Sequence, residues 1–201
     1  EPQIRALCRS VIGELLERTS CDFVSDVASP LPMRVIFLLL GVPEEDWQSL
    51  VALSNQMIDN AGTDIGFAAA LNLFMYSDRY ATMRREKPGD DVVSQLLTGE
   101  VNGELLTPAE FNAFFLLLVV AGNETTRNLI SGGMLELIRN PEQYQRLRTE
   151  PRLMVSAVEE MLRHVAPVSQ FRRTANRDIE LHGKTIKEGD RVILAHASAN
   201  R

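Results

Sequence analysis

The feature that most constrains the fold is a long apolar helix whose first residue is unusually well marked. Thr107 is an N-cap residue, Pro108 stands at the first helical position, and Glu110 follows the cap by three residues, which together make a capping box. The helical pattern continues to about Arg139, where Asn140 and Pro141 end it. A helix over residues 107–139 has roughly 30 residues and spans on the order of 50 Å. We expect it to cross the whole domain as the axis of the fold.

The composition is that of an ordinary globular domain, since 45% of the 201 residues are hydrophobic and 24% are charged. A net charge of -6 argues against a nucleic-acid partner, which needs a clustered basic surface. The longest apolar run, residues 113–121, is about half of the ~20 residues that a membrane span needs. The chain has only two cysteines, Cys8 and Cys21, and so few cysteines are typical of proteins of a reducing compartment. We expect a soluble cytoplasmic protein with no membrane span.

Apolar spacing predicts further helices along the chain. Their expected ranges are residues 4–18, 23–40 with a division near Pro30, 44–59, 67–85, 91–97 with Asp90 as the cap, a short helix at 144–148, and 153–165. Short strands separated by glycine turns are expected near residues 171–194. The predicted fold class is mainly α with a small β-sheet region, in one domain over residues 1–201. Because the chain opens on Glu1 and Pro2 with no initiator Met or apolar leader, we expect it to begin in mid-domain and to be truncated at both ends.

The centre of the long helix carries an unusual polar stretch, residues 121–126, with the sequence Ala-Gly-Asn-Glu-Thr-Thr. A glycine there costs about 1 kcal/mol relative to alanine, and an acid in a buried helix is costly unless it is paired or used. The Thr125 hydroxyl can bond back to the carbonyl of Ala121 and bend the helix. The pattern predicts a groove with a proton source beside it; the structural alternative is that Gly122 only allows close helix packing and that Glu124 and Arg127 form a solvated face.

Two further motifs follow in order. Glu160 and Arg163 stand three residues apart on the 153–165 helix, so they share a face and can form an ion pair. Arg172 and Arg173 come after Pro167 and just before the short strands. Arginine suits bidentate recognition of a carboxylate, and the alternative is that both are simply exposed at the start of a strand.

In this order the three motifs resemble those of the cytochrome P-450 family, and the resemblance covers nearly the whole chain. Two stretches, residues 121–128 and 168–175, look most similar to bacterial members that oxidise steroid side chains, branched lipids or terpenoids. The resemblance implies a heme-dependent monooxygenase with heme b (iron protoporphyrin IX) as cofactor, dioxygen as co-substrate and electrons relayed from NAD(P)H through a ferredoxin. Ala121 and Gly122 would form the oxygen-binding groove, and Glu124 and Thr125 the catalytic acid-alcohol pair.

The same resemblance makes Glu160 and Arg163 a structural ion pair, expected to be buried, and makes Arg173, rather than Arg172, a ligand of a heme propionate. The hydrophobic small-molecule substrate would contact two segments. They comprise Phe114, Leu117, Leu118 and Val120 on the long helix and Val168, Ser169, Gln170 and Phe171 after Pro167. The family's Cys-ligand loop has no counterpart in this chain, so the axial thiolate is expected outside it. We therefore expect the chain alone to be inactive.

Two other functions fit parts of the sequence. A terpene synthase holds magnesium with two acidic motifs on facing helices. Asp90-Asp91 and Asn128 with Glu136 are near misses to these motifs, but Ser94 replaces an acid and Gly132 replaces the hydroxyl ligand. A helical binding module without chemistry would leave Glu124 in the apolar centre unexplained.

Overall fold

The computed structural model describes residues 1–201, with the side chain of Val101 excepted. The chain divides into two compact units, residues 1–127 and 128–201, and each is described by itself. The long helix α6 (Pro108–Arg139) begins in the first unit and ends in the second. The organisation of residues 1–201 as a single domain therefore stays a prediction, although α6 is shared by the two units.

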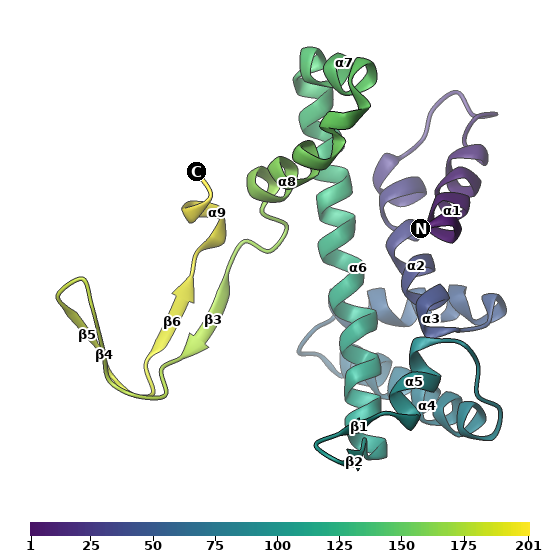
Figure 1. The fold of residues 1–201 in the computed structure, drawn as a ribbon, viewed down its shortest axis with the longest axis vertical. Helices are drawn as coiled ribbons and strands as arrows, with labels where there is room; N and C mark the ends of the chain where they lie inside the picture. Colours follow the sequence, from purple (N-terminus) through teal and green to yellow (C-terminus); the bar gives the residue numbers. More distant parts are fainter. The chain divides into compact units, whose positions relative to one another are not determined.

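The first unit is helical apart from one small hairpin (Figure 1). Its elements are α1 (Pro2–Gly13), a π-helical turn at Val24–Ala28, α2 (Pro30–Leu40), α3 (Glu44–Asp59), α4 (Asp64–Glu86), α5 (Val92–Thr98), the antiparallel strands β1 (Glu100–Val101) and β2 (Glu104–Leu105), and the first part of α6.

Local chemistry explains where several of these helices begin and end. Gly41 ends α2 with a left-handed φ of 70°, a conformation that glycine adopts at little steric cost. The Thr63 hydroxyl accepts a hydrogen bond from the Gly66 amide at 3.3 Å and starts α4. The predicted capping box is present at α6, where the Glu110 carboxylate accepts hydrogen bonds from the amide and hydroxyl of Thr107 at 2.9 and 2.7 Å.

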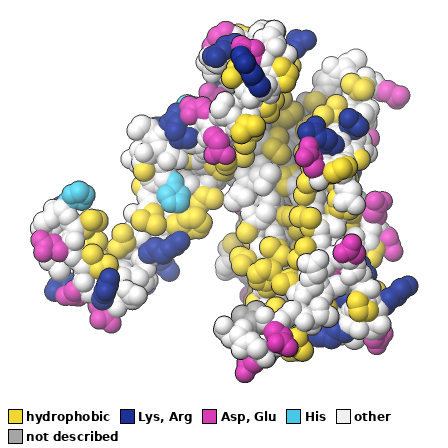
Figure 2. Space-filling view, viewed as in Figure 1, with side chains coloured by type: hydrophobic (Ala, Val, Ile, Leu, Met, Phe, Trp, Pro, Cys, Tyr) yellow, Lys and Arg dark blue, Asp and Glu magenta, His cyan; other side chains and the backbone are white. Residues whose placement is uncertain are grey.

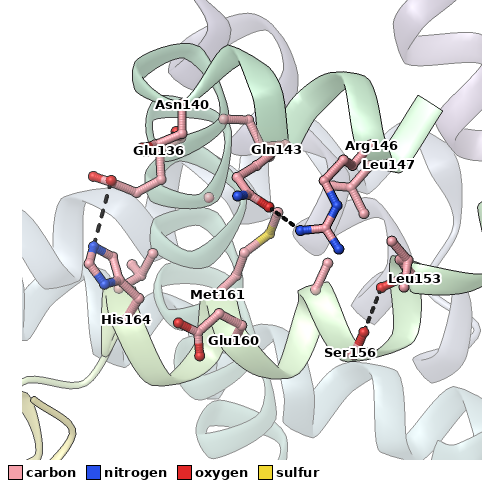
Figure 3. A pocket seen from close by; sticks show the side chains of 14 residues that line it. Glu136, Asn140, Gln143, Arg146, Leu147, Leu153, Ser156, Glu160, Met161 and His164 are labelled. Carbon is pink, nitrogen blue, oxygen red and sulfur yellow. Dashed lines mark hydrogen bonds and ion pairs between the residues drawn. The ribbon is translucent and has the colours of Figure 1, made fainter. Parts of the chain in front are cut away.

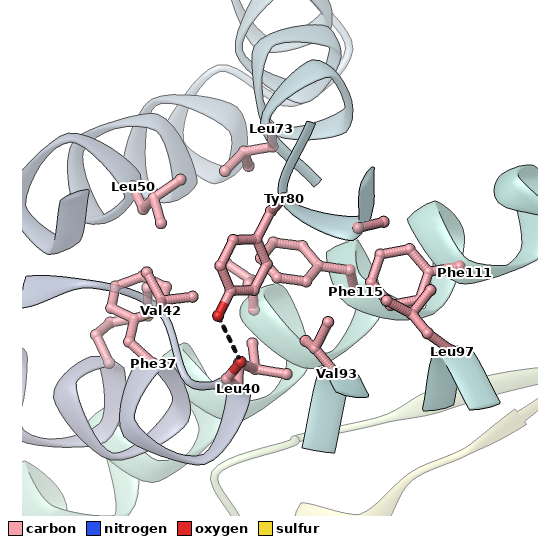
Figure 4. Packing of buried hydrophobic residues seen from close by; sticks show 13 residues of the cluster. Phe37, Leu40, Val42, Leu50, Leu73, Tyr80, Val93, Leu97, Phe111 and Phe115 are labelled. Atoms are coloured by element: carbon pink, nitrogen blue, oxygen red, sulfur yellow. Dashed lines mark hydrogen bonds between the residues drawn. The ribbon is translucent and has the colours of Figure 1, made fainter. Parts of the chain in front are cut away.

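The core of the first unit lies where α2, α3, α4, α5 and α6 pack together (Figure 4). Aromatic rings dominate it: Tyr80 lies 6.4 Å from Phe115, and Phe111 lies 6.3 Å from Phe115, measured between ring centroids. Phe37 and Leu50 bring α2 and α3 onto the same cluster, and both are fully buried. Burial of large apolar side chains is the main source of stability here.

A polar cluster closes one edge of this core. Arg84 of α4 donates hydrogen bonds to the Gly41 carbonyl at 2.7 Å and to the Tyr80 hydroxyl at 2.9 Å, and it pairs with Asp91 at 3.3 Å. The Tyr80 hydroxyl also donates to the Gly41 carbonyl. Asp91 in turn caps α5 by accepting from the Ser94 amide at 2.8 Å. The cluster therefore ties the end of α2, the end of α4 and the start of α5 to one another.

The second unit contains the remainder of α6, then α7 (Pro141–Thr149), a 3-10 turn at Pro151–Leu153, α8 (Met154–Val165) and α9 (His196–Ala199). Its four strands are β3 (Phe171–Thr174), β4 (Ile179–Leu181), β5 (Lys184–Ile186) and β6 (Arg191–Leu194). Strand β3 pairs antiparallel with β6, Arg173 opposite Val192, and β4 pairs antiparallel with β5 (Figure 1). A Cβ on Gly132 would lie 2.7 Å from Val165, and one on Gly133 would lie 2.8 Å from Met161 Sδ, so the glycine pair permits a close approach of α8 to α6.

Most predicted elements are confirmed, with four corrections. The short helix expected at residues 144–148 is longer and begins at Pro141. The first helix ends at Gly13 rather than near residue 18. Helix α4 begins at Asp64, three residues before the predicted start, because Thr63 caps it. The cap of α5 is Asp91, not Asp90, because the Asp91 side chain is the one that accepts the Ser94 amide.

Candidate functional site

The side chains of the polar stretch in α6, residues 121–126, lie in different environments. The Thr125 hydroxyl donates to the Ala121 carbonyl at 2.8 Å, the back-bond that the sequence predicts. Glu124, whose side chain is 41% exposed, pairs with Arg127 at 3.1 Å. Asn123 is fully buried. The acid and the alcohol are therefore adjacent and accessible, while the residue before them faces the protein interior.

Gly122 lies against helix α2. A Cβ built on it would come within 2.5 Å of Ile36 Cδ1, so the glycine permits a close helix contact, as in the structural alternative raised from the sequence. Ala121, in contrast, is exposed. Of the two residues expected to form a groove, only Ala121 lies on the open face of α6, and the groove itself stays a prediction.

A cavity of about 710 Å³ lies beside Glu124 in the first unit. It is lined by the end of α3, the connection to α4, the start of α4, and two residues of α6. The lining residues are Met57, Ile58, Ala61, Gly62, Thr63, Asp64, Gly66, Phe67, Val120 and Glu124. Only Val120 and Glu124 were identified from the sequence, because nothing in the local pattern of residues 57–67 indicates contact with α6. We call this cavity the α3–α4 pocket.

The open face of α6 is apolar. Phe114 is 38% exposed and Leu117 is 57% exposed, and Ala121 continues the strip one turn further. Hydrophobic side chains gather over this part of α6 in Figure 2. Leu118 and Val120 are half-buried. An exposed apolar strip of this kind is suited to an apolar ligand or cofactor face.

The predicted ion pair between Glu160 and Arg163 is present. Arg163 donates from Nε and Nη2 to the two carboxylate oxygens of Glu160 at 2.8 and 2.7 Å, a bidentate geometry. This hydrogen bonding lowers the pKa of Glu160 and raises that of Arg163. Arg163 Nη1 also donates to the Asn200 carbonyl, and Asn200 Nδ2 donates to the Arg163 carbonyl at 3.2 Å. The pair thus ties α8 to the segment that follows α9.

The expectation that this pair is buried is wrong for the described chain. The Arg163 and Glu160 side chains are 46% and 61% exposed. An exposed pair is screened by solvent, so the cost of an uncompensated buried charge does not apply to it.

Arg173 lies exposed on β3, and its side chain is free to take an anion. Its Nη1 donates to the Arg172 carbonyl at 3.0 Å, and its guanidinium lies 5.2 Å from the ring centre of Phe171. No carboxylate within the described residues forms a salt bridge with it. Phe171 is 47% exposed and meets His196 edge to face at 5.6 Å. Ser169 and Gln170 are also exposed and Val168 is half-buried, so the whole segment is accessible within its unit.

The second unit has a cavity of its own, of about 590 Å³, between the end of α6, α7 and α8 (Figure 3). Polar side chains stand at its rim: His164 Nε2 lies 3.6 Å from Glu136 Oε2, and Arg146 donates to Gln143 at 3.2 Å. Leu137 and Met161 are among its apolar lining residues. No local sequence pattern indicates this cavity, because its lining residues come from α6, α7, the 3-10 turn and α8.

Two of the residues of the magnesium alternative, Asp91 and Glu136, are engaged elsewhere. Asp91 caps α5 and pairs with Arg84, and Glu136 pairs with Arg139 at 3.1 Å. Among the described residues, no three His, Cys, Asp or Glu side chains gather as a metal site. No described helix is both long and apolar enough to cross a membrane.

The residues present fit parts of a heme. Within the first unit, the apolar strip of Phe114, Leu117 and Ala121 suits the face of a flat apolar ring. Within the second unit, the Arg173 guanidinium pairs with no carboxylate of the described residues and suits a propionate. Cys8 lies half-buried on α1 and Cys21 is exposed, and neither is assigned as the axial ligand. Residues for the heme face and for one propionate are thus available within the described chain.

Comparison with known proteins gives the family. The family model for cytochrome P-450 matches residues 63–201. The chain is 40% identical over 194 residues to the steroid C26-monooxygenase of Rhodococcus jostii (strain RHA1), covering 94% of this chain and 41% of that protein. It is 40% identical over 202 residues to the methyl-branched lipid omega-hydroxylase of Mycobacterium bovis, covering 97% of this chain and 47% of that protein.

Solved structures agree in fold. The crystal structure of CYP109E1 from Bacillus megaterium in complex with testosterone superposes with a TM-score of 0.94 at 34% identity, covering 100% of this chain and 56% of that one. The structure of CYP268A2 from Mycobacterium marinum in complex with pseudoionone gives a TM-score of 0.91 at 34% identity, covering 99% and 51%. The chain thus spans about half the length of the relatives that it matches. On its motifs, its fold and these matches together, the chain belongs to the cytochrome P-450 family.

Proposed function

We propose that the full-length protein is a monooxygenase that inserts one atom of dioxygen into a C–H bond of an apolar substrate. The second oxygen atom leaves as water, which consumes two electrons and two protons for each product molecule. The observation that carries the proposal is the position of Glu124: it stands next to Thr125 on α6 and lines an apolar-walled pocket. An acid at such a place can supply protons where bulk water is limited.

The heme of this family, when bound, supplies the iron at which dioxygen is activated. Ala121 has a small side chain on the open face of α6 and would leave room for dioxygen beside that group. Thr125 holds a proton at Oγ1, which in the structure is directed to the Ala121 carbonyl at 2.8 Å. The Glu124 carboxylate moves between its ion pair with Arg127 and the α3–α4 pocket, and in doing so carries protons to Thr125.

Two arginines have supporting roles in this proposal. Arg173 binds a propionate carboxylate through its exposed guanidinium. Glu160 and Arg163 have a structural role, because Arg163 connects α8 to the Asn200 backbone.

The proposed substrate is a steroid, a terpenoid or a branched lipid. Relatives that are about 40% identical are named for steroid and methyl-branched lipid oxidation, and a structural relative holds testosterone. The proposed contacts combine the residues expected from the sequence with those of the α3–α4 pocket. They are Phe114, Leu117, Leu118, Val120, Val168, Ser169, Gln170 and Phe171, together with Met57, Ile58 and Phe67.

Electrons are proposed to come from NAD(P)H through a ferredoxin, in the cytoplasm. The support is the sparse cysteine content and the resemblance to bacterial members that use separate redox proteins.

Isotopic dioxygen tests the function. The full-length protein, supplied with NADPH, a ferredoxin reductase and a ferredoxin, is incubated with testosterone, pseudoionone or a methyl-branched fatty acid under labelled dioxygen. We expect one labelled oxygen atom in the product of at least one substrate, and no product when the ferredoxin is omitted. Product that carries oxygen from water would refute the proposal.

A further inference from the structure

Asn123 has an unusual environment for an amide side chain. It is fully buried on the face of α6 that contacts α3, and its Nδ2 lies 3.5 Å from Asn55 Oδ1, at the outer limit of a hydrogen bond. Asn123 Oδ1 is buried and has no hydrogen-bond partner among the described residues. In this orientation the amide nitrogen faces the Asn55 oxygen, and Oδ1 is the end without a donor among the described residues. Rotating the Asn123 amide by 180° would set two oxygens against each other unless Asn55 also rotated, so the contact with Asn55 favours this orientation.

A buried amide is costly at this position unless a further group completes its hydrogen bonds. A leucine of similar size would fill the same space between two helices without that cost. Buried polar groups that lack a protein partner are commonly completed by an internal water, which needs a polar surrounding and two to four partners. The Asn55 and Asn123 amides offer such a surrounding at the α3–α6 contact.

The contact adjoins the α3–α4 pocket on both helices. Ile58 lies three residues after Asn55 on α3, and Val120 lies three residues before Asn123 on α6, and both line the pocket. Residues three apart on a helix are neighbours on one face. Glu124, which also lines the pocket, follows Asn123 directly. The spacing of α3 and α6 at the amide pair thus determines the spacing of two pocket walls one turn away.

We propose that the unpartnered end of the Asn123 amide binds a buried water at the α3–α6 contact, and that the hydrated Asn55–Asn123 pair sets the width of the α3–α4 pocket beside Glu124. Asn123 is then a positioning residue that acts through Ile58 and Val120. The water site rests on burial and hydrogen bonding alone, whereas the effect on turnover rests on the proposed function.

Crystal structures of the full-length protein and of three variants test the site. Asn123→Leu removes both polar ends of the amide at similar size, and Asn123→Ser keeps one hydroxyl that can hold the water. Ser54→Ala is the matched control, because Ser54 Oγ on the same helix α3 is also buried and unpartnered among the described residues. We expect water density within about 3.2 Å of the Asn123 amide in the wild type and in Ser54→Ala. In Asn123→Ser we expect water next to the hydroxyl.

In Asn123→Leu we expect no water at the contact, together with a changed separation of Ile58 and Val120. A wild-type map in which only protein atoms contact the Asn123 amide would overturn the proposal, as would an unchanged pocket in Asn123→Leu. If Asn123→Leu does not crystallise, oxygen-17 relaxation dispersion of water counts long-lived internal waters in solution. One fewer in Asn123→Leu than in both the wild type and Asn123→Ser supports the proposal, and an equal number in all three contradicts it.

Steady-state kinetics distinguish a positioning role of Asn123 from a role in stability alone. With the substrate that incorporates labelled oxygen, Asn123→Leu should raise KM by about tenfold, the equivalent of 1.4 kcal/mol of binding, with kcat within about twofold. Asn123→Ser should restore KM, and Ser54→Ala should leave both constants unchanged. An equal fall of kcat in Asn123→Leu and Ser54→Ala would refute the positioning role. Should no substrate incorporate oxygen, the proposed function fails while the crystallographic result still decides the water site.

Discussion

Asp91 is expected to be one of the most important polar residues for the stability of the first unit. Its side chain is 6% exposed, pairs with Arg84 at 3.3 Å and caps α5 by accepting the Ser94 amide at 2.8 Å. Removing one partner of a buried ion pair costs about 3–5 kcal/mol, and loss of an N-cap costs about 1 kcal/mol. The two losses share one side chain and are not additive. Because Arg84, 20% exposed, retains the Gly41 carbonyl and the Tyr80 hydroxyl, we expect Asp91→Ala to lower the free energy of unfolding by about 3–4 kcal/mol.

The chain offers two controls for this prediction. Asp91→Asn keeps an oxygen that can cap α5 but removes the charge, so it should cost about 1 kcal/mol less than Asp91→Ala. Asp90→Ala removes the neighbouring acid, which is exposed and does not cap the helix, and should change stability by less than about 0.5 kcal/mol. Urea denaturation of the full-length protein and its variants, followed by circular dichroism, measures all three. Equal effects of Asp91→Ala and Asp90→Ala would show that the Arg84 cluster does not stabilise the fold.

Three further predictions concern α6 and α8. Gly122→Ala should destabilise the protein by no more than about 1 kcal/mol, because the new Cβ would lie 2.5 Å from Ile36 Cδ1, the end of a side chain that can turn aside, and because alanine favours helix by about 1 kcal/mol. Ile36→Val removes that methyl group and should make Gly122→Ala neutral or stabilising in a thermal unfolding assay, whereas additive effects of the two changes would contradict the contact. Arg163→Ala should speed amide hydrogen exchange at Ala199 and Asn200, because Arg163 holds the Asn200 carbonyl, whereas unchanged exchange in that segment would mean that the pair does not anchor it. The hydrogen bond from the Thr107 hydroxyl lowers the pKa of Glu110. The stability that Glu110 contributes is therefore present above its unfolded pKa of about 4.3 and is lost as the pH falls through the lower folded pKa. The Tm difference between wild type and Glu110→Gln should shrink below pH ~4, and a Tm difference that stays constant with pH would refute this cause.

The helices could be predicted from the sequence where their signals are local. The capping box at Thr107 and Glu110 predicts the start of α6, and the Asn140-Pro141 step predicts its end. The error between Asp90 and Asp91 has a tertiary cause, because Arg84 binds the second of two adjacent acids. Local sequence does not distinguish two neighbouring acids as caps.

The candidate site was predictable only where it lies on one helix. Glu124 and Thr125 are neighbours in the sequence, and the Thr125 back-bond to Ala121 follows from helix geometry. Met57, Ile58 and Phe67 reach the pocket only through packing of the α3–α4 connection against α6, which no local pattern encodes. Burial of Glu160 and Arg163 was expected from the family resemblance, and the described chain leaves both side chains about half exposed.

The most direct test of the account is the yield of product per NAD(P)H consumed by the full-length Thr125→Ala variant. Glu124→Gln serves as the companion variant, and hydrogen peroxide is measured alongside product. If Thr125 holds a proton for oxygen activation, Thr125→Ala should still bind heme and substrate but release most electrons as hydrogen peroxide. Glu124→Gln should slow turnover by about 10²-fold or more while losing less coupling, as expected for a general acid. If Thr125 only bonds back to the Ala121 carbonyl, the variant will change stability slightly and form as much product per NAD(P)H as the wild type, and that result would contradict the proposed role of α6.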